Sequence, residues 1–205
     1  MLWHFLTLLV LALALGVVAL LTSLLCFKLI SCLRYCTQTA TAATDGILVQ
    51  QHIGASPFFN RSWQQFKVGF GNESGNYWIG NERLHQLTKD GRYKLRVDVL
   101  ASFNGQWYWA EYSGFGVGSE SSGYALFVSG YSGNAGDAMT VDGDRSINLN
   151  SKRFRTHDRG FGIYRHCVRT GNWLGGFWYS SIVNCGYALL NQATYFQWIS
   201  LPLGT

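Results

Sequence analysis

The stretch from Gly69 to Leu100 constrains the fold most, because it joins a helix, a turn and an amphipathic strand without interruption. Asn81 occupies a position typical of a helix N-cap, and the two leucines that follow it are spaced to face a core from one side of a short helix. Lys89-Asp90-Gly91 supplies turn chemistry. From Tyr93 to Val99 apolar and charged residues then alternate, which is the period of a strand with one face in a core and the other in water. The stretch predicts folded protein.

The composition favours a loop-rich globular fold. The 205 residues are 48% apolar and 16% aromatic, which is enough for a core, and 24 glycines against 2 prolines favour many tight turns over a helical bundle. The formal charge of +5 is uneven: residues 145–205 hold seven Lys or Arg against one Asp, a net of +6. No helix, finger or stacking motif frames this basic region, so we do not expect nucleic acid as a partner. A solvated loop face and attraction to anionic glycans or acidic lipids both stay open.

The N-terminal apolar run predicts a membrane anchor. From Phe5 to Phe27 the polar side chains are two threonines and one serine, and a helix of this length, at about 1.5 Å per residue, would cross hydrocarbon about 30 Å thick. A cleaved signal peptide, and hence secretion, is the alternative, but its apolar core is shorter and follows positive charge. No Lys or Arg precedes this run. We expect residues 1–36 to form a transmembrane anchor and its flanks.

Residues 37–57 are predicted to be a linker, because they are small and polar and show no sustained period. The folded domain is then expected over residues 58–205.

Four ordered blocks, YWIGNERLHQLT, YKLRVDV, AEYSGFGVGSE and GYSGNAGDAM, resemble the fibrinogen-related domain found at the C-terminal end of ficolins, tenascins, angiopoietins and fibrinogen chains. The resemblance covers roughly Phe58 to Tyr195. It implies an α+β fold in which an antiparallel sheet carries short helices and long loops. Members of the family have a further N-terminal subdomain where the linker stands, and a further strand after the position of Thr205. The resemblance is therefore to a partial domain, incomplete at both ends, and an open sheet edge would favour a homo-oligomer.

The sequence gives conflicting indications of whether the C-terminal part lies in the cytosol or outside the cell. Lys28 and Arg34 follow the apolar run while only His4 precedes it, and the positive-inside rule would then place the C-terminal part in the cytosol. Asn60-Arg61-Ser62 and Asn72-Glu73-Ser74 are glycosylation acceptor sequences, which are useful only in a lumen. Members of the family resembled are secreted or extracellular. We expect a single-pass cell-membrane protein with an extracellular C-terminal domain.

The five cysteines form two groups. Cys26, Cys32 and Cys36 cluster at the end of the apolar run, where interchain disulfides, palmitoylation and unmodified thiols are all open. Cys167 and Cys185 are best interpreted as one intradomain disulfide. Zinc is the weaker alternative, since the nearby histidines lack paired short spacings.

The segment from Phe154 to Asp158 resembles the start of the family's calcium loop. Asp158 matches the first carboxylate, but the second falls on Gly160, and Arg159 and Arg165 add positive charge where a divalent cation needs negative charge. We expect weak or no calcium binding and no other cofactor.

In ficolin-like members, aromatic side chains and a cis peptide bond before the second conserved cysteine frame a pocket for acetyl groups. Carried over to this sequence, the resemblance implies that the pocket is lined by Trp178, Tyr179, Asn184, Cys185 and Tyr195. Gly186, Leu189 and Gln192 depart from the family's pattern. An aromatic core beside a disulfide is the alternative interpretation.

No catalytic signature of a hydrolase elbow, zinc protease or kinase occurs in the sequence, and we do not expect an enzyme. The leading hypothesis is a membrane-anchored, extracellular recognition module that binds carbohydrate, with acetylated glycans or other acetylated compounds as candidate ligands. The alternatives are a protein-interaction or adhesion module with cell-surface or matrix partners and a degenerate pocket, and a divergent fragment without a ligand.

Overall fold

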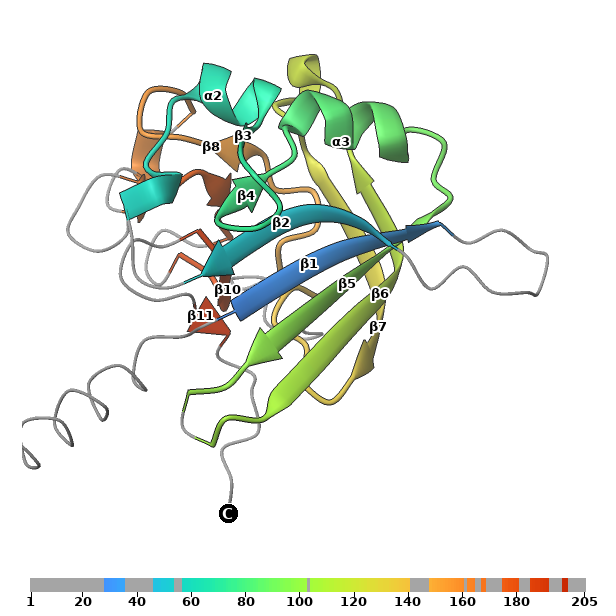
Figure 1. Cartoon of the computed structure of the whole chain (residues 1–205). Helices are drawn as coiled ribbons and strands as arrows, with labels where there is room; N and C mark the ends of the chain where they lie inside the picture. The colour runs from blue at the N-terminus through green and yellow to red at the C-terminus, as the bar shows by residue number, and fades with distance from the viewer. Residues whose placement is uncertain are drawn as a thin grey trace, which may run out of the picture.

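The computed structural model describes residues 28–35, 46–53, 57–102, 104–140, 148–160, 162–164, 167–168, 175–180, 185–191 and 197–198 (Figure 1). Seven strands form one antiparallel sheet in the order β3-β4-β2-β1-β5-β6-β7. The strands are β1 (Lys28–Tyr35), β2 (Ile47–Ile53), β3 (Phe70–Gly71), β4 (Tyr77–Trp78), β5 (Tyr93–Leu100), β6 (Trp107–Val117) and β7 (Leu126–Gly133).

Short helices and small strand pairs complete the described fold. The helices are α2 (Trp63–Val68), α3 (Asn81–Thr88) and the 3-10 turns η1 (Pro57–Phe59), η2 (Glu120–Ser122) and η3 (Gly162–Tyr164). Two pairs of two-residue strands are β8 (Phe154–Arg155) with β9 (Phe177–Trp178) and β10 (Ala188–Leu189) with β11 (Gln197–Trp198). Figure 1 shows α2 and α3 at one end of the sheet, and the orange and red segments that follow β7 gathered beside β2 and β4. The expected antiparallel α+β fold with short helices is confirmed.

The amphipathic pattern of the sequence predicts β5 correctly. Its apolar positions from Tyr93 to Val99 are buried, and the charged positions between them are half-buried on the opposite face. The predicted helix that precedes β5 is also present, but its cap differs. Gly80, with φ of 105°, is the N-cap of α3, and Asn81 is the first helical residue. The Asn81 side chain is buried instead, and its Oδ1 accepts a hydrogen bond of 3.1 Å from Trp78 Nε1.

The structure differs from the expected linker and domain boundary. Within residues 37–57, strand β2 pairs with β4 on one side and with β1 on the other, and β1 lies between β2 and β5. Three polar residues of this segment, Gln50, Gln51 and His52, are buried and hydrogen-bonded. Gln50 Nε2 donates to the carbonyl of Leu190 at 3.2 Å and to Asn191 Oδ1 at 3.0 Å. The sheet therefore begins before Phe58, in segments assigned to the anchor's flank and the linker.

The expected membrane anchor, Phe5 to Phe27, lies outside the described residues. Within the part of the chain that the structure describes, no helix is both long and apolar enough to cross a membrane. The cysteines at positions 26 and 36 also lie outside the described residues.

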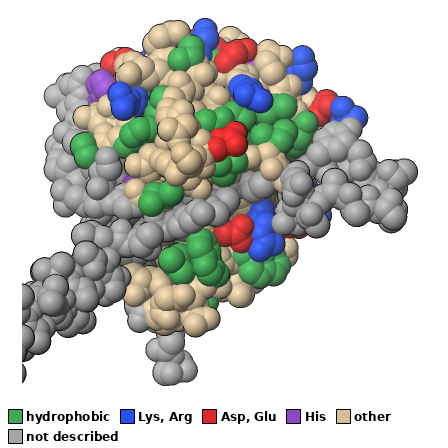
Figure 2. Space-filling view, viewed as in Figure 1, with side chains coloured by type: hydrophobic (Ala, Val, Ile, Leu, Met, Phe, Trp, Pro, Cys, Tyr) green, Lys and Arg blue, Asp and Glu red, His purple; other side chains and the backbone are tan. Residues whose placement is uncertain are grey.

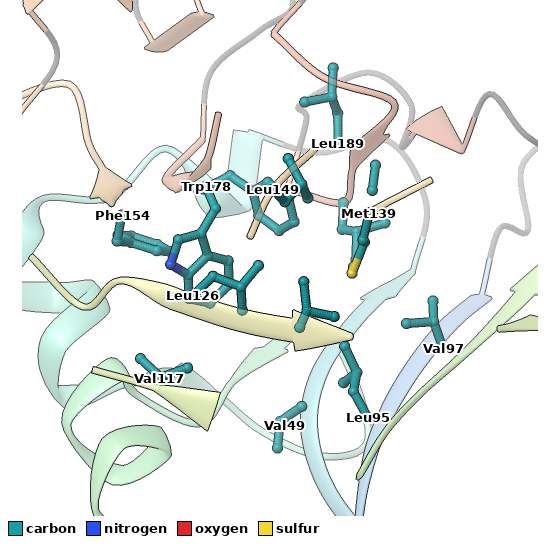
Figure 3. Packing of buried hydrophobic residues seen from close by; sticks show 14 of the residues in the cluster. Val49, Leu95, Val97, Val117, Leu126, Met139, Leu149, Phe154, Trp178 and Leu189 are labelled. Carbon is teal, nitrogen blue, oxygen red and sulfur yellow. The ribbon is translucent and has the colours of Figure 1, made fainter. Parts of the chain in front are cut away.

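An aromatic layer fills the core between the sheet and the C-terminal segments. Trp178 packs edge to face on Phe154, with ring centroids 5.0 Å apart, and lies 6.0 Å from the ring of Trp78. Phe66, from α2, lies 5.0 Å from Phe154. Figure 3 shows Trp178 between Phe154 and Leu126. Four separate elements thus meet in one layer of rings, in the tilted and edge-to-face geometries that aromatic pairs prefer.

The expected disulfide between Cys167 and Cys185 is confirmed. It closes a separation of 18 residues, and both cysteines are buried. On the chain-entropy model a loop of this size stabilises a fold by about 3 kcal/mol. Because both sulfurs are in the disulfide, they are not thiolate ligands for zinc.

Candidate functional site

The two aromatic residues expected to line a pocket are buried beside the disulfide. Trp178 is 5% exposed and Tyr179 is 3% exposed. Trp178 Nε1 donates to the carbonyl of Tyr124 at 2.7 Å, and the Tyr179 hydroxyl donates to the carbonyl of Gly175. Burial raises the pKa of Tyr179 above its ordinary value, so the hydroxyl stays protonated. The positions of these two rings correspond to the alternative interpretation, an aromatic core beside a disulfide.

Cys185 lies next to the residues that follow Trp178 and Tyr179. Its carbonyl accepts the amide of Ser180 at 3.3 Å, so the chain returns to the end of β9. Its φ of 65° is unusual for a residue other than glycine. Asn184 and Tyr195 lie outside the described residues, and so does the peptide bond before Cys185 that the resemblance expects in the cis form. The structure therefore brings together Trp178, Tyr179 and Cys185 of the five expected residues.

Asn191 and two residues of β2, Gln50 and His52, make hydrogen bonds that hold the chain near Gly176 and Leu190. The sequence analysis did not assign these three residues a role. Asn191 Nδ2 donates to the carbonyl of Gly176 at 2.7 Å, while its Oδ1 accepts from Gln50. His52 Nδ1 lies 2.9 Å from the carbonyl of Leu190. Because a carbonyl only accepts hydrogen bonds, Nδ1 of His52 carries the proton. The contacts with β2 cross 138 to 141 residues of sequence, so local patterns contain no signal for them.

Asp158, expected as a degraded calcium ligand, makes hydrogen bonds within the fold. Its Oδ1 accepts from the backbone amide of Trp63 at 2.9 Å and from the Thr156 hydroxyl at 2.7 Å. Partial burial raises the pKa of Asp158, but these hydrogen bonds outweigh it and the net shift is downward. Among the described residues no group of three or more His, Cys, Asp or Glu side chains could hold a metal ion.

Glu120 is the centre of a charged cluster that also contains Trp63, Lys67 and Arg159. Its Oε1 accepts from Trp63 Nε1 and from Arg159 Nη1, each at 2.8 Å, and its Oε2 pairs with Lys67 Nζ at 2.6 Å. The Arg159 guanidinium lies 4.2 Å from the centre of the Trp63 ring, within the range of a cation–π contact. This Glu120 cluster joins α2, η2 and the loop after β8.

The Glu120 cluster contains one cation of the basic region, Arg159. Hydrogen bonds from Lys67 and Trp63 are the main causes that lower the pKa of Glu120 to about 2, against a model-compound value of 4.5. Arg159, which we expected to weaken a calcium site, is thus paired with a carboxylate that the sequence places 39 residues away. On the face shown in Figure 2, basic and acidic side chains lie dispersed rather than gathered in one patch of a single sign.

Both expected glycosylation positions are at the surface. Asn60 follows η1 and Asn72 follows β3, and both side chains are exposed. Asn72 Oδ1 accepts hydrogen bonds from the amide and the hydroxyl of Ser74, at 3.1 and 2.7 Å. Neither position requires refolding to accommodate a glycan.

Comparison with known proteins gives consistent matches. The family model described as fibrinogen beta and gamma chains, C-terminal globular domain, matches residues 26–200. The human fibrinogen alpha chain is 40% identical over 170 residues, which are 78% of this chain and 19% of that protein. Protein scabrous of Drosophila melanogaster is 35% identical over 167 residues, or 77% of this chain and 18% of that protein. The chain thus spans about a fifth of the length of these curated relatives.

Solved structures show the same fold. The fibrinogen-like globe domain of human ANGPTL6 superposes with a TM-score of 0.52 at 27% identity, over 80% of this chain and 60% of that chain. Lamprey fibrin D-dimer, in complex with the peptide ligand Gly-His-Arg-Pro-amide, gives a TM-score of 0.53 at 24% identity, over 80% of this chain and 57% of that chain. The second likeness shows the fold alone.

The Glu120 cluster predicts how stability depends on pH. Because the pKa of Glu120 in the folded protein lies below its ordinary value, the ionised group stabilises the fold above about pH 4.5, and this stabilisation is lost as the pH falls toward 2. Glu120→Gln should cost on the order of 1 kcal/mol at neutral pH, because the cluster is partly solvated. The difference between the two proteins should then shrink between about pH 4.5 and 2. Thermal melting across this range measures it.

Other carboxylates with lowered pKa values, such as Glu82 and Asp158, are present in both proteins and cancel in the difference. Parallel pH profiles of the wild type and Glu120→Gln would contradict the assignment.

Proposed function

The chain belongs to the family of fibrinogen C-terminal globular domains, and on this basis we propose that it is an extracellular recognition module, without catalytic activity, whose ligand is carbohydrate. The observation that carries the proposal is that residues 177–180 and 185–191 are tied to the rest of the fold by the disulfide of Cys185 and by hydrogen bonds with Gln50 and His52 of β2. A rigid, well-packed support is what a ligand-binding surface needs to keep its geometry.

The disulfide supports the extracellular part of the proposal. Structural disulfides persist in secreted and extracellular proteins, and Cys167 and Cys185 form one in the core of the C-terminal region. The exposed acceptor asparagines at 60 and 72 fit the same compartment. We further propose that the apolar run from Phe5 to Phe27 anchors the domain to the cell membrane, with secretion as the alternative.

Trp178 and Tyr179, two of the residues of the expected pocket, are buried. We propose that Asn184 and Tyr195 supply groups that contact an acetylated glycan, while Trp178 and Tyr179 position the segment from inside the core. Cys185 fixes the chain between them through its disulfide.

A protein-interaction or adhesion module is the second candidate. Two positions that depart from the ficolin-like pattern, Gly186 and Leu189, are both buried, so neither offers a polar group to a sugar. A pocket without these groups could serve a protein partner at the cell surface or in the matrix instead.

Retention on immobilised N-acetylglucosamine tests the carbohydrate proposal. The domain, produced through the secretory pathway, should be retained and then released by free N-acetylglucosamine. Asn184→Ala and Tyr195→Ala should each weaken binding about tenfold, a loss equivalent to about 1.4 kcal/mol. Val68→Ser, at a side chain that is 64% exposed on α2, is the control and should bind as the wild type does. Absence of retention on acetylated sugars would leave the protein-interaction candidate.

Glycan mapping tests the topology. When the full chain is expressed in mammalian cells, Asn60→Gln and Asn72→Gln should each remove one N-linked glycan, seen as a step in mobility that glycosidase treatment abolishes. The double variant should carry none of the glycan at these positions. A wild type in which both asparagines are unmodified would indicate that the domain faces the cytosol.

A further inference from the structure

The hairpin between β5 and β6 lies at the end of the sheet where β1 begins. Leu29, the second residue of β1, pairs with Val99 of β5, and Val99 pairs with Tyr108 of β6. Two strand spacings of about 4.8 Å therefore place the base of the hairpin about 10 Å from the start of β1. Figure 1 shows the start of β1, the arrowhead of β5 and the start of β6 at the lower left of the sheet.

The proposed membrane anchor ends close to this point in the chain. Its last residue, Phe27, precedes Leu29 by two positions, which span at most about 7 Å. Because β5 runs antiparallel to β1, the residues after Val99 extend past the start of β1. At about 3.3 Å per residue, the tip at Asn104 and Gly105 reaches up to about 10 Å past the level of Leu29. The headgroup layer on each side of the hydrocarbon is about 5 to 7 Å thick, so the tip of an anchored chain lies at its level.

The hairpin combines exposed aromatic surface with an absence of charge. The stretch from Val99 to Ala110 contains no Asp, Glu, Lys or Arg. The Trp107 side chain is 47% exposed. The other exposed side chains among the described residues of the tip are those of Ser102, Asn104 and Gln106, which are polar and uncharged. Tryptophan is enriched at the membrane–water interface, because its indole has an apolar ring and one hydrogen-bond donor.

The backbone of the tip is closed by hydrogen bonds within the hairpin. The amide of Ala101 donates to the carbonyl of Gln106 at 2.9 Å, and the amide of Gly105 donates to the carbonyl of Ala101 at 2.8 Å. Asn104 Oδ1 accepts from the amide of Gln106 at 3.0 Å, and Asn104 Nδ2 donates to the Tyr108 hydroxyl at 3.0 Å. Polar groups that are already paired lose little when water is displaced, so this tip can approach a bilayer without unfolding.

The charges nearest to the tip on these two strands lie beside charges of opposite sign. Asp98 Oδ1 is 2.9 Å from Arg96 Nη2, and Glu111 Oε1 is 3.3 Å from Lys94 Nζ. The two pairs carry no net charge, and they lie on the part of the strands that is farther from the tip. The uncharged surface is therefore confined to the end of the hairpin that faces the proposed anchor.

The other side of the same sheet end differs from the hairpin. Asn72, an expected glycosylation position, and Glu73 follow β3, and both side chains are exposed. Strand β3 is three places from β1 in the sheet, or about 14 Å, on the side away from β5. A glycan at Asn72 needs free space on that side. The sheet end can therefore meet a bilayer with its hairpin side only.

We propose that the tip of the β5–β6 hairpin, with Trp107 as its aromatic residue, contacts the lipid headgroups of the membrane that holds the anchor. The inference rests on the proposed anchor from Phe5 to Phe27, and it adds a second point of contact that sets the tilt of the domain. The opposite end of the sheet then faces away from the membrane. Phe127, which is 54% exposed, lies there, because its partner Gly116 follows Trp107 by nine residues in β6, a distance of about 30 Å.

Quenching of tryptophan fluorescence by lipid tests the proposal. The full chain is reconstituted in phosphatidylcholine vesicles, with and without bromine on the acyl chains near the headgroup. Trp107→Phe removes the indole at the tip, and the fluorescence that this variant loses should be a component that brominated lipid quenches. Phe127→Trp adds an indole at the opposite end of the sheet, and the fluorescence that it gains should not respond to bromine. Trp107→Phe should melt as the wild type does, because the side chain it replaces is 47% exposed.

A wash with alkaline carbonate separates failure of the anchor from failure of the hairpin contact. If the chain stays in the vesicles but the Trp107 component is unquenched, the hairpin contact is wrong, the anchor stands, and the exposed indole is left to a protein partner. Equal quenching of the indoles at positions 107 and 127 would also overturn the contact. If carbonate removes the chain, both the anchor and the contact are wrong. Should Phe127→Trp not fold, Val68→Trp on α2, at a side chain that is 64% exposed, replaces it.

Discussion

The packing of Trp178 against rings from β4 and β8, which also contact Phe66 of α2, is the interaction on which the rest of the described fold depends. Its ring meets Phe154 and Trp78 directly, and its indole nitrogen donates to the carbonyl of Tyr124, so its apolar surface and its single donor are both satisfied. Aromatic pairs of this geometry contribute about 0.5 to 1.5 kcal/mol each beyond the area they bury. The layer therefore fixes the helices, the sheet and the disulfide-bonded segment as one unit.

Buried polar hydrogen bonds fix the position of β2 relative to the C-terminal segment within that unit. Gln50 and His52 hydrogen-bond to Leu190 and Asn191, which are nearly at the other end of the chain. A buried donor without a partner costs about 1 to 3 kcal/mol, so β2 and the C-terminal segment each stabilise the position of the other. At the surface, the carboxylate of Glu120 joins elements that the aromatic layer has already brought together. These polar contacts join elements that the hydrophobic packing also holds together.

The sequence predicts features that depend on local periodicity and does not predict those that depend on distant partners. The alternation in β5 is local, and so is the spacing of the helix after Gly80, and both were recognised. Strand β2 was missed because Gln50 and its polar neighbours are typical of a linker until the partners 140 residues away are known. For Trp178, the same residue type fits a ligand pocket and a core, and only its burial in three dimensions distinguishes them.

The free energy of unfolding of Trp178→Ala, measured by urea denaturation, tests the role of the aromatic layer most directly. Removing a ring that is 5% exposed and contacts several other rings should cost about 3 to 5 kcal/mol. Val68→Ala, on the exposed side of α2, should change the value by less than about 0.5 kcal/mol. A loss below about 1 kcal/mol for Trp178→Ala, with native circular dichroism, would contradict the conclusion that this residue holds the fold together.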